Sequence, residues 1–69
     1  MLNTVDARGR SCPEPVVLTR KALEQFPRGV QVILDNATSR DNVKRFAESK
    51  GYKTETTMDG EDFVVRIAQ

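Results

Sequence analysis

The stretch Val30-Gln31-Val32-Ile33-Leu34, followed by Asp35-Asn36, lies near the middle of this 69-residue chain. It is a short, mainly apolar and β-branched run that ends at turn-forming residues, which is typical of a strand buried in the centre of a sheet. Segments with a helical period lie on both sides of it. A buried strand between two helical segments predicts an α/β domain.

The segment before this strand has the spacing of an amphipathic helix. Its core-facing positions recur every three or four residues, at Val16, Thr19, Ala22, Leu23 and Phe26. Pro27 ends the pattern, and Arg28-Gly29 supplies the turn into the strand. We therefore predict a helix from about Pro13 to Phe26, preceded by a short strand over Leu2 to Ala7.

A second helix and a hairpin follow the central strand. Thr38 or Ser39 can cap this helix, and Gly51 stands just past its end. Its buried stripe consists of Val43, Phe46, Ala47 and the aliphatic stem of Lys50. Two alternating segments, Tyr52 to Met58 and Asp62 to Ala68, flank Asp59-Gly60, which is a strong hairpin pattern.

Together these elements predict a single domain over residues 1–69 with the order β-α-β-α-β-β. The expected fold is an α/β (α+β) two-layer sandwich, in which a mixed four-stranded sheet carries both helices on one face. Its parallel crossovers should be right-handed. A chain of this length forms a thin core, so a deep, enclosed active site is not expected.

The composition excludes several classes of function. Eleven Lys and Arg residues against ten Asp and Glu leave a net charge of +1, which argues against direct nucleic-acid binding. The chain has no histidine and one cysteine, so it offers no Cys-His pair and no usual zinc site, and we expect neither a metal nor a cofactor. It also has no long apolar run and no signal-peptide pattern, which predicts a cytoplasmic protein without a membrane segment.

The single cysteine, Cys12, stands where the first helix is predicted to begin. Unpaired backbone N–H groups and the helix dipole stabilise an anion there, so we expect the pKa of the Cys12 thiol to be lowered and the thiolate to be nucleophilic. Ser11 and Glu14 fit a capping box, while Pro13 and Pro15 are tolerated in a first turn. Gly9 permits a tight turn from the strand into the helix.

Other residues near Cys12 are candidates for contact with a partner. Arg8 and Arg10 flank it and can stabilise an anion or contact an acidic surface, although turn arginines are often simply solvated. Val17 and Leu18 lie beside the core stripe, near Lys21, and predict an apolar docking patch one turn from the cysteine. The alternative for Val17 is an isolated surface valine, and the alternative for Cys12 is a buried structural thiol.

The stretch Asp6-Ala7-Arg8-Gly9-Arg10-Ser11-Cys12-Pro13-Glu14-Pro15 resembles the D-x-x-G-x-x-C-P-x-P signature of the TusA/SirA/YedF family. The similarity extends from about Thr4 to Ile67, with the elements in the order usual for the family. The stretch from Asp35-Asn36 through Asn42 to Gly51 is similar to the YedF-like branch, specifically its N-terminal domain. Arg10 departs from the apolar residue usual at its position, and no Asp-Asp-Pro follows the second strand as it does in the tRNA-thiolation carriers.

This resemblance implies a cytoplasmic sulfur carrier of β-α-β-α-β-β fold, sulfurtransferase-like but without turnover of its own. Cys12 matches the family cysteine that accepts sulfane sulfur as a persulfide. A donor such as a cysteine desulfurase or another persulfide protein would load it, and a sulfur-relay protein or sulfur-using enzyme would accept the sulfur. The resemblance leaves open tRNA thiolation, molybdenum cofactor assembly, sulfur oxidation and selenium metabolism.

Two alternatives to a sulfur carrier follow from the same residues. In the first, Cys12 is a redox-sensing or regulatory thiol that is oxidised or forms a disulfide between chains. In the second, the chain is a binding module in which Cys12 is incidental. The near-neutral charge, the single tyrosine and the absence of tryptophan argue against nucleic-acid binding by such a module.

Overall fold

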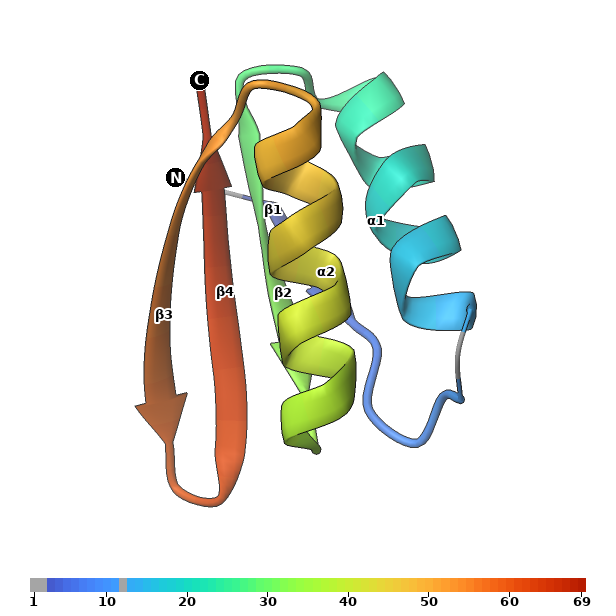
Figure 1. Ribbon diagram of the computed structural model, residues 1–69, viewed down its shortest axis with the longest axis vertical. Helices are drawn as coiled ribbons and strands as arrows, with labels where there is room; N and C mark the ends of the chain where they lie inside the picture. Colours follow the sequence, from blue (N-terminus) through green and yellow to red (C-terminus); the bar gives the residue numbers. More distant parts are fainter. Residues whose placement is uncertain (1–2, 12) are drawn as a thin grey trace.

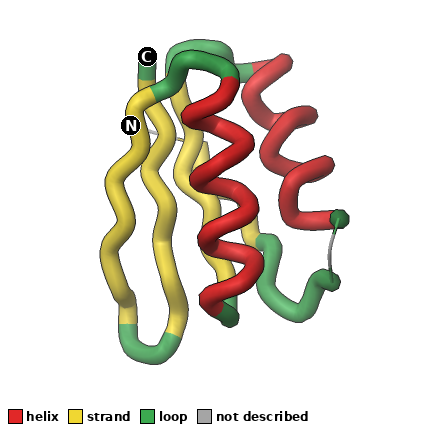
Figure 2. The backbone as a smooth tube through the Cα atoms, viewed as in Figure 1, coloured by secondary structure: helices red, strands yellow, loops and turns green. Residues whose placement is uncertain are grey.

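Four strands form one mixed sheet, and two helices cover one of its faces in the computed structural model, which describes residues 3–11 and 13–69 (Figure 1). The elements are β1 (Asn3–Asp6), α1 (Glu14–Gln25), β2 (Gly29–Leu34), α2 (Ala37–Ser49), β3 (Lys53–Asp59) and β4 (Asp62–Ala68). This order and the two-layer arrangement confirm the predicted fold class (Figure 2). The predicted start of the first strand, Leu2, lies outside the described residues.

The strands are ordered β1-β2-β4-β3 across the sheet. The β1 and β2 strands run parallel, whereas β4 is antiparallel to both β2 and β3. The central position of β2 confirms the interpretation of the Val30 to Leu34 run. The last strand of the chain, β4, therefore lies between β2 and β3 and contributes the second buried row of the sheet.

The core lies between the sheet and the helices. Side chains alternate along a strand, so Val30, Val32 and Leu34 of β2 all face the helices and are completely buried. Val65 and Ile67 of β4 are buried on the same face. The helices contribute Leu23, Val43 and Ala47 to this cluster. The other face of the sheet carries no helix, as Figure 1 shows.

The helix ends differ from the sequence prediction. Asn36, not Thr38 or Ser39, caps α2: its backbone is extended and its Oδ1 accepts the Ser39 N–H at 2.8 Å. Ser39 is instead buried. At the other end the Tyr52 and Gly51 N–H groups donate to the Ala47 and Glu48 carbonyls, which is a Schellman motif.

Two side chains that were expected in the core are exposed. The helical spacing predicts Phe26 on the buried stripe, but α1 ends at Gln25, and Phe26 leaves the helical path as the C-cap residue and is 40% exposed. Lys50, whose stem was expected on the stripe, is likewise the C-cap of α2 and is exposed, with its ammonium 5.9 Å from the centre of the Phe46 ring. In both cases the chain turns at the end of the helix, so a helical spacing no longer predicts which way the side chain points.

Candidate functional site

The loop between β1 and α1 carries the sequence motif. Cys12, the predicted nucleophile, lies outside the described residues, so the site is defined by the residues around it. Ala7 continues the pairing of β1 with β2, because its N–H donates to the Ile33 carbonyl at 2.9 Å, and its side chain is buried. The chain then leaves the sheet at the edge where the parallel strands β1 and β2 both end.

A carboxylate from the end of β2 holds this loop. The Gly9 N–H donates to Asp35 Oδ2 at 2.7 Å, and the Asn36 side chain donates to Asp35 Oδ1 at 3.0 Å. Gly9 has φ of +73°, a conformation that residues with a Cβ rarely adopt. Glycine at this position therefore permits the turn that sequence analysis predicted.

Arg8 links the loop to two other carboxylates. Its Nη2 and Nε donate to Asp6 Oδ2 and Oδ1 at 2.8 and 3.0 Å, a two-pronged contact. Its Nη1 donates to Asp62 Oδ2 at 2.9 Å, at the start of β4. The Arg8 backbone N–H also donates to Asp6 Oδ1 at 3.1 Å. Arg8 thus joins the end of β1 to β4, and its predicted role in partner docking stays a prediction.

These contacts stabilise the ionised carboxylates. The hydrogen bonds from Arg8 lower the pKa of Asp6 from its ordinary value of 3.8 to about 2. The Gly9 N–H, followed by the Asn36 side chain, also lowers the pKa of Asp35. The same contacts, with Asp6 first, raise the pKa of Arg8 further. The loop is therefore held by groups that stay charged over the whole neutral range.

Arg10 and Glu14 flank Cys12 in the sequence and form an ion pair, with Arg10 Nη1 3.2 Å from Glu14 Oε2. Both side chains are about half exposed. The predicted capping box is wrong, because α1 begins at Glu14 and Pro13 is its N-cap without a side-chain hydrogen bond. Ser11 contributes instead through its backbone carbonyl, which accepts the Glu14 N–H at 2.9 Å. Glu14 still places a negative charge in the first turn, where the helix dipole favours it.

The two prolines of the motif have different environments. Pro13 is exposed, whereas Pro15 is buried to less than 2% exposure. The Pro15 carbonyl accepts the hydroxyl of Thr19, which is also completely buried, at 2.8 Å. The first turn of α1 is therefore anchored in the core through Pro15 rather than only stiffened by it.

The predicted docking patch on α1 is less exposed than its sequence pattern indicated. Leu18 is half-buried and packs against the core, and Val17 is also half-buried. Lys21 is exposed. The helix therefore presents a wider buried face than the predicted stripe, and the docking role of Val17 and Leu18 stays a prediction.

The sequence pattern did not predict a role for the three aspartates that bind this loop, Asp6, Asp35 and Asp62. Asp6 belongs to the quoted motif, and Asp35 was noted only as the end of a strand. Their positions could have been predicted to lie close together, because Asp6 and Asp35 stand at the carboxyl ends of two adjacent parallel strands, which meet at the same edge of a sheet. Asp62 had no such signal, since its contact with Arg8 joins residues 54 positions apart.

Residues 3–11 and 13–69 contain no group of three or more His, Cys, Asp or Glu side chains placed to hold a metal ion. Within the same residues, neither helix has the length and apolar character needed to cross a membrane.

Comparison with known proteins gives three consistent matches. The family model described as "Sulfurtransferase TusA" matches residues 3–69. A protein of Methanocaldococcus jannaschii, provisionally named a sulfur carrier protein, is 42% identical over 53 residues, which are 74% of this chain and 71% of that protein. The crystal structure of a SirA-like protein from Desulfitobacterium hafniense superposes with a TM-score of 0.87 at 38% identity, covering 97% of this chain and 96% of the other.

Proposed function

This chain belongs to the TusA family, whose members include sulfur carriers, and from that premise we propose that Cys12 receives sulfane sulfur as a persulfide and passes it to an acceptor protein. In this proposal the chain is a carrier rather than a turnover enzyme. It needs no cofactor, because the transferred sulfur is the only cargo and another protein supplies each reaction partner.

The proposed exchange conserves atoms and electrons. The Cys12 thiolate attacks the outer sulfur of a donor cysteine persulfide, a new S–S bond forms on Cys12, and the donor S–S bond breaks. The electron pair of that bond stays on the donor cysteine, which leaves as a thiolate. An acceptor thiolate then attacks the outer sulfur on Cys12 in the same way and restores the Cys12 thiolate. No external oxidant or reductant is required.

The attachment of the loop to the sheet is the observation that carries this proposal. A carrier must present its thiol to two different partners in turn, which favours a loop fixed to a rigid element. Gly9 is held by Asp35 at 2.7 Å, and Arg8 is held by Asp6 and Asp62. On the other side, Pro15 anchors the first turn of a 12-residue helix, whose positive dipole end favours a thiolate or persulfide anion.

The partners follow from the chemistry of the exchange. The donor would be a cysteine desulfurase or another protein that carries a persulfide, and the acceptor a relay protein or a sulfur-using enzyme. Such an exchange requires a compartment that keeps Cys12 reduced between transfers, which favours the cytoplasm. Selenium as cargo and the individual pathway are further proposals for the same cysteine.

Mass spectrometry of the intact chain tests the proposal. After incubation with a cysteine desulfurase, its cofactor and cysteine, we expect the parent chain to gain the mass of one sulfur atom on Cys12, and to lose it to an acceptor thiol. Cys12→Ser should gain none while keeping the circular dichroism spectrum of the parent. Oxygen adducts or a disulfide between chains, without a sulfur adduct, would support a redox sensor instead. Unfolding of the serine variant would indicate a structural thiol.

A further inference from the structure

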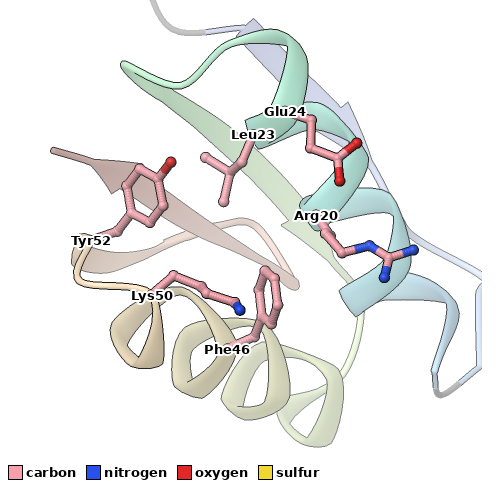
Figure 3. Close-up of a pocket in the computed structure, with 6 residues that line it drawn as sticks. All are labelled: Arg20, Leu23, Glu24, Phe46, Lys50 and Tyr52. Carbon is pink, nitrogen blue, oxygen red and sulfur yellow. The ribbon is translucent and has the colours of Figure 1, made fainter.

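The outer surface of the helix layer is hollowed between α1 and α2. One hollow of about 380 Å³ is lined by Arg20, Leu23, Glu24, Phe46, Lys50 and Tyr52 (Figure 3). A second hollow of about 380 Å³ is lined by Val16, Asn42, Arg45, Phe46 and Ser49. Phe46 lines both hollows, so they adjoin each other between the two helices, and we call the pair of hollows the α1–α2 groove.

The floor of the groove is apolar. Figure 3 shows Leu23 of α1 facing Phe46 and Tyr52, with the Lys50 side chain running beside Phe46. Leu23 is buried, and Phe46 and Tyr52 are half-buried against the core. The Lys50 ammonium lies 5.9 Å from the centre of the Phe46 ring. The aromatic surface is thus open to a ligand and already has a cation beside it.

The rim of the groove carries an excess of positive charge. Arg20, Arg45 and Lys50 line it together with one acidic residue, Glu24. None of these three cations forms an ion pair with any of the described residues, whereas Arg8, Arg10 and Arg40 each do. The whole chain has a net charge of only +1, whereas the lining of this groove has three cations and one carboxylate. Asp41, which lies outside the lining, interacts electrostatically with Arg45 but forms its ion pair with Arg40.

We propose that the α1–α2 groove binds an acidic amphipathic helix of a partner protein, with apolar anchors in the two hollows and carboxylates against Arg20, Arg45 and Lys50. Along α1, Arg20 lies four positions and Glu24 eight positions beyond Val16, which correspond to rises of about 6 Å and about 12 Å. Anchors at positions i, i+4 and i+7 of a bound helix span the same distance. Charge complementarity of this kind sets the choice of partner and its association rate.

The groove opens near the start of α1, since Val16 is only four residues beyond Cys12 in the sequence. A helix lying in it would bring the rest of its protein close to the motif loop. The identification of this partner as a sulfur donor or acceptor rests on the proposed function. The binding itself does not, so it can be measured without any sulfur transfer.

The test uses the full chain and a synthetic probe helix of about 15 residues, long enough to be helical when bound. The probe carries Leu at three positions with i, i+4 and i+7 spacing and Glu on its flanks. Titration calorimetry gives the affinity, and backbone amide shifts in NMR spectra give the site. The double variant Arg20→Glu with Lys50→Glu is compared with Arg66→Glu, which reverses a charge on the exposed surface of β4. Thermal unfolding of each variant confirms that it is folded.

We expect the amide shifts to follow the groove, and the double variant to bind about tenfold or more weakly than the parent while Arg66→Glu binds normally. Replacing Glu in the probe by Lys, or its three Leu residues by Ser, should each abolish binding. No binding of the probe at millimolar concentration, or equal loss in Arg66→Glu and the double variant, would overturn the proposal. The proposal would also be overturned if a short RNA displaced the probe and the probe still bound after its three Leu residues were replaced by Ser. If Cys12 is loaded with sulfur but the probe does not bind, only the groove proposal is refuted. If the probe binds but Cys12 is not loaded, only the sulfur-carrier proposal is refuted.

Discussion

Substitution of Gly9 tests whether the motif loop needs its observed backbone conformation. Gly9 has φ of +73°, and a Cβ added there would meet no atom within 4 Å. Steric contact therefore adds nothing, and Gly9→Ala should cost only the left-handed backbone penalty, about 1–2 kcal/mol. For a domain of this size that corresponds to a fall in Tm of about 4–8 °C per kcal/mol. The altered loop should also present Cys12 poorly and slow sulfur transfer.

Gly60 provides a matched control for this experiment. It has φ of +65° and equally open surroundings, but it lies in the β3–β4 turn. Gly60→Ala should therefore lower the free energy of unfolding by the same amount without slowing transfer. Urea denaturation gives the stabilities, and persulfide loading from one donor at fixed concentrations gives the rates.

The comparison can fail in two distinguishable ways. If Gly9→Ala is as stable as the parent, the positive φ at this position is not required. If Gly60→Ala slows persulfide loading as much as Gly9→Ala does, the slower loading reflects general destabilisation, and the conformation of the β1–α1 loop has no special role. Gly9→Asn gives a further check, because asparagine tolerates positive φ better than alanine and should recover part of both losses.

Two other substitutions follow from contacts at the same loop. The pKa of Asp6 is lowered to about 2, so its contribution to stability is complete above about pH 4 and is lost as the pH falls towards 2. Asp6→Asn should reduce the loss of stability between about pH 4 and pH 2. Asp59→Asn, which removes a carboxylate that forms no ion pair with any described residue, is the matched control. Pro15→Ala removes two buried methylene groups and should cost about 2 kcal/mol in urea denaturation. The exposed Pro13→Ala should cost only about 0.4–1 kcal/mol, and equal costs would contradict the burial argument.

Local pattern was enough to predict the secondary structure and the fold class. The β-branched run of β2, the helical spacings on both sides of it and the Asp59-Gly60 turn each depend on neighbours within a few residues, and that is where sequence periodicity carries information. The motif around Cys12 identified the family, because its residues are contiguous in the sequence. The end of α2 just before Gly51 was also predicted, since its capping hydrogen bonds connect residues at most five positions apart.

The tertiary structure decided what depends on residues distant in the sequence. Gly9 meets Asp35 and Arg8 meets Asp62 only because β2 and β4 are placed beside the motif loop, across 26 and 54 positions. No periodicity encodes such contacts, because they arise from the strand order, which only the packing of the whole sheet specifies. The burial of Pro15 and the exposure of Phe26 have the same origin: the sequence gives each residue its local conformation, but whether a side chain meets the core depends on where the helix ends and how it lies on the sheet.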